Sequence, residues 1–314
     1  MRIGWAGLGA MGTPMATCLA RAGHEVTGYD VDPERASALA GAGVRAAGSI
    51  ADLAGSANVV AIMVATPDQL EQALFGAAGA EGPSGAEGPS GAEGPSGAEG
   101  TGGLAGALRA GTTVMIMATV GPEAVVSAAA RLQDHGVAVV DAPVSGGVTR
   151  AADGDLLIMV SGADDTVALV RPLLDALARS APLVGPSPGD GQRMKLVNQL
   201  LCGVHIAAAA EALAFAESLG LEAEHCWQVL RDGAAASFMF EDRGARMVAG
   251  EFGDVRSAMD IFVKDMGLVG AAAEEAGAGV PLASAARRLY DRGHDLGLGR
   301  LDDSALIEVL RGRR

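Results

Sequence analysis

The sequence predicts an α/β fold: a doubly wound, mainly parallel sheet, followed by an all-α C-terminal domain that begins with a long linking helix. Three observations favour this fold. Strand-like and helix-like segments alternate up to about residue 185, strand patterns end near Gly189, and a glycine-rich turn follows the first strand. We therefore expect two domains, with residues 1–187 in the first and 188–314 in the second.

The first strand, turn and helix have the order that a dinucleotide requires. An apolar run leads into Gly7-x-Gly9-x-x-Gly12, and a helix pattern covers 11–22. Gly7 allows a tight turn, Gly9 lets the backbone approach a pyrophosphate, and Gly12 lets the helix pack close to the strand. The helix N-terminus offers unpaired N–H groups to phosphates. The turn therefore predicts a Rossmann-type cofactor site, although a tight turn without a ligand would need the same glycines.

The second strand ends in an acid, Asp30. Its carboxylate is placed to accept hydrogen bonds from a ribose diol, and its charge would repel a 2′-phosphate. This residue predicts NAD as the cofactor in preference to NADP.

Apolar periodicity and capping residues predict the remaining elements. Asp32-Pro33 has the form of an N-cap followed by a first-turn proline and opens a helix up to Ala40. In the first domain, strands are expected at 58–64, 113–117, 137–140 and 156–160, and helices at 122–135 and 164–178. In the second, helices are expected at 192–219, 222–232, 238–249, 257–277, 281–293 and 302–311. The length of the first of these suggests burial on several faces, in part within a homodimer or homotetramer.

The segment 79–102 repeats Gly-Ala-Glu-Gly-Pro-Ser and fits neither domain. Its glycine period of three is formally that of collagen. Proline is too sparse and the run too short for a triple helix, so a flexible, solvent-exposed insertion is expected. We predict no catalytic role for it.

Charge and cysteine content exclude several classes of protein. The net charge of −15 argues against nucleic acid and anionic membranes as partners. The three cysteines, at 18, 202 and 226, show no zinc-type spacing, so reduced thiols, a cytoplasmic location and no metal site are expected. Glycines interrupt the apolar N-terminus, which argues against a signal peptide, and no uncharged apolar run is long enough to span a bilayer.

A hydroxyl and two adjacent glycines follow the strand that ends at Asp141. Ser145 can donate a hydrogen bond, and the N–H groups of Gly146 and Gly147 are sterically open. This cluster fits a carboxylate-binding site and a glycine-rich turn equally well.

Two lysines stand in apolar helical surroundings. Lys195 has Asn198 and Gln199 near it on one helical face, at i+3 and i+4. Partial desolvation would lower the pKa of this lysine and suit it to proton transfer, whereas a surface lysine is the simpler interpretation. Lys264 and Asp265 lie inside another apolar helix, either facing a cleft or forming a structural ion pair.

In this order, the clusters resemble the β-hydroxyacid dehydrogenase family, which includes 3-hydroxyisobutyrate dehydrogenase and is similar to 6-phosphogluconate dehydrogenase. The matching motifs are GLGAMGTPMA at the start, DAPVSGGVTRAADGDLLIMVSG at 141–162, GDGQRMKLVNQ at 189–199 and FVKD at 262–265. The resemblance covers nearly the whole chain except the repeat. It implies an oxidoreductase that transfers a hydride between NAD and a small hydroxy acid, with an NAD-binding domain followed by a substrate and dimerisation domain.

The resemblance also implies a role for each matching residue. Cofactor binding falls to Gly7, Leu8, Gly9, Ala10, Met11, Gly12, Asp30 and Thr119, the last beside the nicotinamide ribose. Substrate binding falls to Ser145, Gly146 and Gly147 at the carboxylate, and to Asn198 and Gln199. Lys195 is the implied general acid/base. Lys264 lies near both nicotinamide and substrate, and Asp265 orients it.

Gln199 departs from many family members, which have Asn at this position. With LLCGVHI at 200–206, SFMFEDR at 237–243 and Asp302-Asp303-Ser304, it resembles the L-threonate dehydrogenase subgroup. This implies oxidation of a C4 sugar acid at C2. The alternatives are 3-hydroxyisobutyrate or tartronate semialdehyde (glyoxylate-type) chemistry, imine reduction, against which Lys195 counts, and a non-catalytic NAD-binding protein.

Overall fold

The structure is a computed structural model that describes residues 1–76 and 102–312. The chain forms two compact units, Met1–Gln192 and Arg193–Arg314. The predicted insertion at 79–102 lies, apart from Gly102, outside the described residues. Gly76 and Gly102 pair in an isolated antiparallel bridge.

The first unit is built on an eight-stranded sheet of order β11-β9-β6-β5-β4-β1-β2-β3. Its strands are β1 (Arg2–Ala6), β2 (Glu25–Tyr29), β3 (Val44–Ala46), β4 (Val59–Ile62), β5 (Thr113–Ile116), β6 (Ala138–Asp141), β9 (Val160–Ser161) and β11 (Leu183–Gly185). Neighbouring strands run parallel except β6 and β9. The strand order reverses between β1 and β4, which confirms the predicted doubly wound, mainly parallel sheet.

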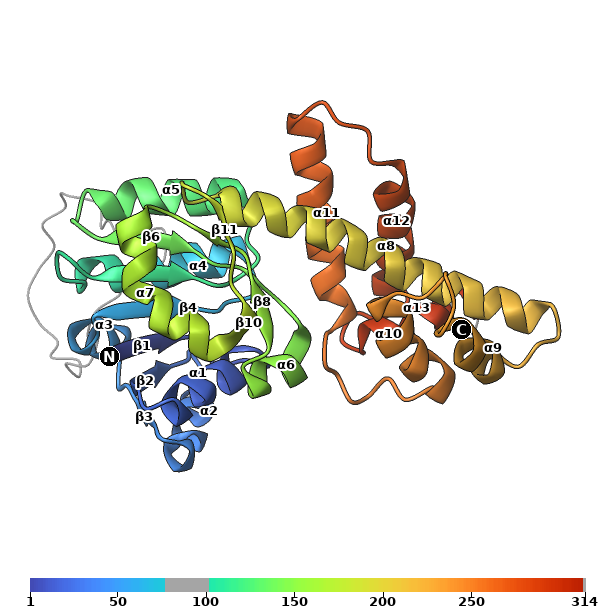
Figure 1. Cartoon of the computed structure of the whole chain (residues 1–314), viewed down its shortest axis with the longest axis horizontal. Coiled ribbons are helices and arrows are strands. Elements are labelled where there is room, and N and C mark those ends of the chain that lie inside the picture. The colour runs from blue at the N-terminus through green and yellow to red at the C-terminus, as the bar shows by residue number, and fades with distance from the viewer. Residues whose placement is uncertain (77–101, 313–314) are drawn as a thin grey trace, which may run out of the picture. The chain divides into compact units, whose positions relative to one another are not determined.

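Helices cover both faces of this sheet (Figure 1). One face packs on α1 (Gly12–Arg21), α2 (Pro33–Ala38), α6 (Gly147–Asp153) and α7 (Asp164–Leu177). The other packs on α3 (Ile50–Ser56), α4 (Pro67–Phe75), the 3₁₀ turn η2 (Leu104–Gly106) and α5 (Pro122–Gln133). Alternate residues of each central strand enter the two cores, since side chains along a strand point to opposite faces. The strands therefore read as continuous apolar runs, as sheets buried on both faces require.

A second, three-stranded sheet comprises β7 (Val144–Ser145), β8 (Leu156–Ile158) and β10 (Ala178–Ser180). The single strand predicted at 156–160 is wrong, because β8 belongs to this sheet and β9 to the large one. The chain changes partners between them: Met159 N donates to Pro143 O and Val160 N donates to Pro182 O, both at 3.0 Å. An unbroken apolar run carries no local signal of such a change.

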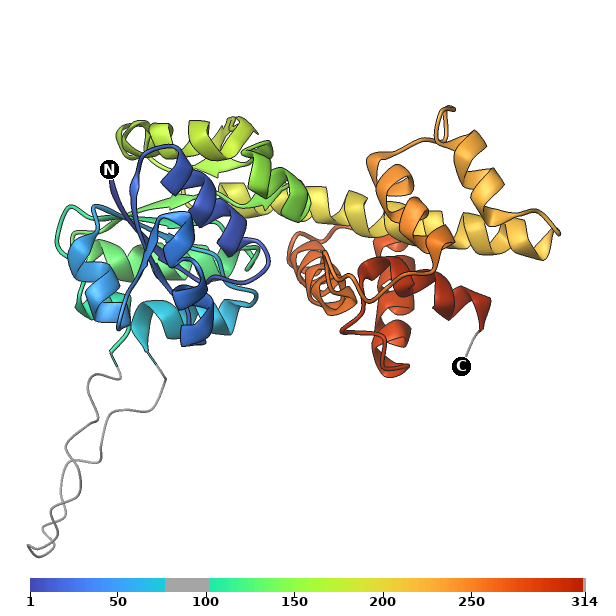
Figure 2. The ribbon, with the colours of Figure 1, turned by 90° about the horizontal axis from the view of Figure 1, so that it is seen from below.

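The second unit is all-α over its described residues, as the sequence predicts (Figure 2). Its elements are the continuation of α8 (Asp190–Ser218), then α9 (Ala223–Leu230), α10 (Phe238–Ala249), α11 (Met259–Glu275), α12 (Pro281–Asp295), the 3₁₀ turn η3 (Asp303–Ala305) and α13 (Leu306–Arg311). α11 and α12 pack side by side, with Phe262 and Tyr290 stacked at 5.3 Å between ring centroids. The core lies between these helices and the inner face of α8.

Among the described residues, α8 is the one helix long and apolar enough, by length and composition, to cross a membrane. Less than half of its most apolar stretch is buried within the chain. A core helix of a soluble protein meets the same criterion.

Candidate active site

The glycine turn after β1 has the geometry that the sequence predicts. Gly7 has a φ of +94°, which side chains rarely adopt, and its N–H donates to Tyr29 O at 2.9 Å. A Cβ atom on Gly12 would overlap the carbonyl oxygen of Gly7, whereas a Cβ on Gly9 would meet no atom within 4 Å. The turn therefore has no room for a side chain at Gly7 or Gly12. The space beside Gly9 is open, as the approach of a pyrophosphate requires.

Asp30 lies beside this turn, at the end of β2. Its Oδ2 accepts the Leu8 N–H at 2.7 Å, and its Oδ1 accepts the Asp32 N–H at 3.0 Å. Arg35 Nη1 lies 3.6 Å from Asp30 Oδ1. Each carboxylate oxygen can accept about two hydrogen bonds, so this fixed carboxylate keeps capacity for ribose hydroxyls. The residues of the turn therefore fit a bound dinucleotide.

Thr119 lies half-buried in the loop between β5 and α5. Because β1, β2 and β5 are parallel, Gly7, Asp30 and Thr119 follow strands at the same edge of the sheet. Open α/β sheets bind ligands at this carboxyl edge, near the reversal of strand order. The first unit thus brings the predicted cofactor residues together.

The Ser145–Gly147 segment belongs to the smaller sheet and the start of α6. Gly146 has a φ of +147° and Gly147 one of +75°, both favouring glycine. A Cβ on Gly146 would also press on Leu156 and Arg150. The backbone conformation alone accounts for both glycines, so the carboxylate site stays a prediction.

Lys195 is buried in the second unit, with 5% of its surface exposed. Burial lowers its pKa because the interior disfavours the ammonium; the charge of Asp265 opposes this shift and that of Lys264 adds to it. A neutral amine can accept a proton. Of the 23 lysines and arginines in the chain, only these two are lysines. Since arginine keeps its proton in proteins, Lys195 and Lys264 carry the side-chain amines of the chain.

An oriented hydrogen-bond chain connects α8 to α11 beside Lys195. Lys264 Nζ lies 2.9 Å from Asp265 Oδ1, and Gln199 Nε2 donates to Asp265 Oδ2. Asn198 Nδ2 donates to Gln199 Oε1 at 2.8 Å and to Cys202 Sγ at 3.3 Å. A carboxylate only accepts hydrogen bonds, so Gln199 must turn its amide nitrogen to Asp265 and its oxygen to Asn198. The second unit thus brings the predicted proton-transfer residues together.

Cys202 is a member of this cluster that sequence reasoning treated only as a free thiol. Burial raises the pKa of the Cys202 thiol, and the charges of Lys195 and Arg243 oppose that shift. Its position two helical turns after Lys195 is the signal that could have identified it.

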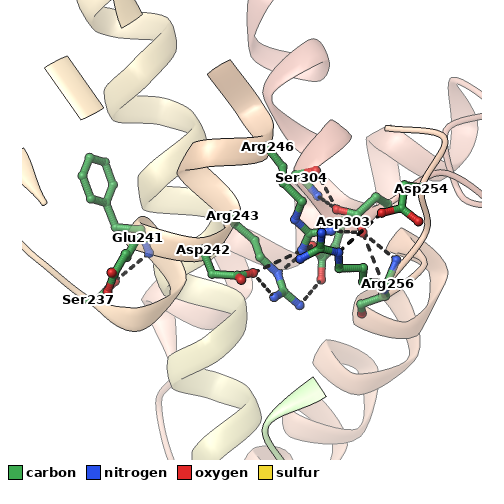
Figure 3. A network of polar contacts seen from close by, with 12 residues as sticks. Ser237, Glu241, Asp242, Arg243, Arg246, Asp254, Arg256, Asp303 and Ser304 are labelled. Atoms are coloured by element: carbon green, nitrogen blue, oxygen red, sulfur yellow. Dashed lines mark hydrogen bonds and ion pairs between the residues drawn. The ribbon is translucent and has the colours of Figure 1, made fainter. Parts of the chain in front are cut away.

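A buried ionic network joins the two C-terminal motifs that the sequence set apart (Figure 3). Arg243 Nε and Nη2 donate to the Asp303 carboxylate at 3.0 and 3.1 Å, and Arg246 donates to Asp302 and Asp242. Asp303 is fully buried. Because a lone buried charge is strongly destabilising, these pairs hold α10 to η3. Their role in the described fold is structural.

No group of three or more His, Cys, Asp or Glu side chains within 1–76 and 102–312 could hold a metal ion.

Comparison with known proteins places this geometry in a family. Residues 2–86 and 89–185 match the model described as the NAD binding domain of 6-phosphogluconate dehydrogenase. Residues 189–310 match the model described as NAD-binding of NADP-dependent 3-hydroxyisobutyrate dehydrogenase.

Individual relatives span the whole chain. L-threonate dehydrogenase from Cupriavidus necator is 37% identical, over 99% of this chain and 96% of its own length. 2-Hydroxy-3-oxopropionate reductase from Escherichia coli is 31% identical, over 99% and 97%. The crystal structure of 3-hydroxyisobutyrate dehydrogenase from Salmonella typhimurium has a TM-score of 0.86 at 34% identity, covering 98% of this chain and 99% of that one. The chain therefore belongs to the β-hydroxyacid dehydrogenase family and is a hydroxyacid dehydrogenase that binds a nicotinamide cofactor.

Proposed function

We propose that this chain is an NAD-dependent dehydrogenase that oxidises a C4 sugar acid, such as L-threonate, at C2. The observation that carries the proposal is the buried amine of Lys195, held beside Asp265 and Lys264 on a neighbouring helix. Support for the substrate comes from the relative named L-threonate dehydrogenase. Support for NAD comes from the Asp30 carboxylate, whose charge opposes a 2′-phosphate.

NAD, held at the turn after β1, would supply the acceptor for a hydride from the hydroxyl-bearing carbon. The residues of the chain move the proton: Lys195, neutral in the reactive complex, takes it from the substrate hydroxyl at Nζ. Burial keeps the amine neutral at a lower pH than an ordinary lysine, because the pKa of Lys195 is lowered. Lys264 lies near nicotinamide and substrate, and Asp265 orients it through the 2.9 Å ion pair.

Other side chains orient the substrate. Ser145 and the N–H groups of Gly146 and Gly147 hold the carboxylate. The side-chain amides of Asn198 and Gln199 form hydrogen bonds with the hydroxyls of the sugar acid. The amide nitrogen of Gln199 has two N–H groups and gives one to Asp265, so the other is available to an oxygen of the substrate.

The test is a screen for reduced-nicotinamide absorbance with C3–C6 hydroxy acids, each offered with NAD and with NADP. The panel contains threonate stereoisomers, erythronate, 3-hydroxyisobutyrate, glycerate and 6-phosphogluconate. We expect the highest kcat/KM for L-threonate with NAD. A preference for 3-hydroxyisobutyrate would contradict the proposed substrate, and a strong preference for NADP would contradict the role of Asp30.

Lys195→Ala tests the mechanism. Loss of a general base lowers turnover by about 10²–10⁴-fold, whereas NADH binding, assigned to the first unit, is expected to persist. Lys264→Ala in parallel separates loss of the base from loss of a charge. Near-normal turnover of Lys195→Ala would remove this residue from the mechanism.

A further inference from the structure

A buried glutamine at the start of α8 holds the loop that carries Thr119. Gln192 is fully buried. Its Oε1 accepts the N–H groups of Val120 and Gly121 at 3.0 and 3.1 Å, and its Nε2 donates to Ala118 O at 3.0 Å. One side-chain amide thus binds the backbone on both sides of Thr119.

Asp141, the last residue of β6, fixes the orientation of this amide. Its Oδ1 accepts the second Nε2 hydrogen of Gln192 at 2.8 Å. Because a carboxylate only accepts, Nε2 must face Asp141 and Oε1 must face the loop. All four hydrogen-bonding positions of the Gln192 amide are then filled by protein groups, which leaves none for a ligand.

The same carboxylate anchors the first turn of α8 through separate atoms. Asp141 Oδ2 accepts the backbone N–H groups of Gly189 and Gln192, each at 2.9 Å, and the Ser161 hydroxyl at 3.3 Å. Gly191 N donates to Ser161 Oγ at 2.9 Å. The first turn of α8 is therefore held by its own backbone N–H groups, whereas the Gln192 side chain binds the backbone of the loop at 118–121. A change confined to this side chain separates the two roles.

We propose that Gln192 is a positioning residue for the nicotinamide cofactor, setting the backbone at 118–121 and thereby the place of Thr119. It acts without touching the cofactor. The inference rests on the proposed function, in which Thr119 lies beside the nicotinamide ribose. Buried N–H and C=O groups that lose their partners carry a full desolvation penalty, so the loop has to rearrange when the amide is changed.

Gln192→Glu tests the proposal because it changes the donors and keeps the size. The carboxylate still accepts from Val120 and Gly121, but it no longer donates to Ala118 and it opposes Asp141. Asp141→Asn breaks the same pair from the other side, since two amide donors then face each other. Combining both changes restores one donor and one acceptor between these positions, with the new Asn amide donating to the new Glu carboxylate.

The measurement is NADH affinity by fluorescence titration at about pH 8 and again at about pH 9.5, because two adjacent buried carboxyls can share a proton well above their ordinary pKa, and a shared proton would restore the broken bond in Gln192→Glu. Each single variant is expected to bind NADH about tenfold more weakly, and the double variant is expected to bind more tightly than either single variant but more weakly than wild type, because Ala118 O still lacks its donor. Gln133→Glu makes the same chemical change on the exposed end of α5 and is expected to leave affinity unchanged. Urea midpoints are recorded for all variants.

The outcomes separate this inference from the proposed function. If wild type does not bind NADH, the proposed function fails, and Thr119 has no cofactor for Gln192 to serve. If wild type binds and the single variants bind equally well while their urea midpoints fall, Gln192 is only structural and the inference is overturned. Should neither single variant fold, the double variant decides: a restored fold with NADH binding weaker than wild type supports the inference, because Ala118 O lacks its donor, and wild-type affinity overturns it.

Discussion

At the residue scale, two adjacent charges on α11 adjust the pKa of Lys195 in opposite directions. Burial lowers this pKa, Asp265 raises it and Lys264 lowers it further. With Lys195 as the base, oxidation becomes faster as pH rises through that pKa, because the ammonium loses its proton. The pH at which kcat/KM rises therefore depends on the charges beside the Lys195 amine.

Asp265→Asn and Lys264→Gln are expected to move the pH profile of kcat/KM in opposite directions. Removing the negative charge lowers the pKa of Lys195 and shifts the rise to lower pH, whereas removing the positive charge raises that pKa and shifts the rise to higher pH. Glu274→Gln, an exposed carboxylate on the same helix, serves as the control.

Selective ¹³Cε-lysine labelling follows the amines directly, because the chain contains two lysines. Lys264→Gln assigns the spectrum by removing one resonance. If the remaining resonance titrates as expected while kcat/KM does not shift with it, the catalytic base is another group.

Gln199 and Gln192 mark the limit of prediction at this scale. The helical period placed Lys195, Asn198 and Gln199 on one face because their spacing is local. The bond from Gln199 to Asp265 joins residues 66 apart, and those from Gln192 to its loop join residues 71 to 74 apart. Such pairings depend on how helices and loops pack, and no local pattern in the chain specifies them.

At the scale of elements, two glycines of the β1–turn–α1 unit have different roles: Gly12 allows close packing, and Gly9 leaves space for a ligand. A Cβ on Gly12 would overlap the Gly7 carbonyl, but the space around Gly9 is open. Gly12→Ala is therefore expected to lower the free energy of unfolding by about 1–3 kcal/mol through overpacking. Gly9→Ala is expected to change it by less than about 0.5 kcal/mol and to weaken NADH binding about tenfold, because the methyl occupies the path of the pyrophosphate.

Tryptophan fluorescence measures both effects in a Trp227→Phe background. Trp5 then remains as the reporter, buried under the turn with its Nε1 donating to Gly7 O at 3.0 Å. Urea unfolding gives stability, and NADH titration gives affinity. Gly9→Ala with unchanged affinity would show that the pyrophosphate does not approach this turn.

Element prediction succeeded where the signal is periodic and long. The central strands and the long helices follow from apolar runs and repeating apolar faces. The three-stranded sheet was not predicted, because β7 has two residues and β8 and β10 have three each. The division of 156–160 between two sheets likewise depends on hydrogen bonds to Pro143 and Pro182, which are remote from the run itself.

At the scale of the whole molecule, α8 leaves an apolar stripe uncovered. Met194, Val197, Leu201 and Phe215 are 46%, 59%, 50% and 62% exposed, and their spacing of three, four and fourteen residues keeps them on one helical face. The opposite face enters the core of the second unit. Exposed apolar side chains aligned on one helical face are typical of interaction sites, and pairing of two copies would cover the stripe on both.

We therefore expect a homodimer or homotetramer, measured by light scattering coupled to size exclusion. Leu201→Glu with Phe215→Glu places charges on the stripe of every copy and is expected to yield monomers with an unchanged far-ultraviolet circular dichroism spectrum. Leu282→Glu is the matched control: this leucine is 69% exposed on a different helix, α12, so the wild-type mass should persist. A monomeric wild type, or a double variant that keeps the wild-type mass, would show that the stripe does not join copies of this chain.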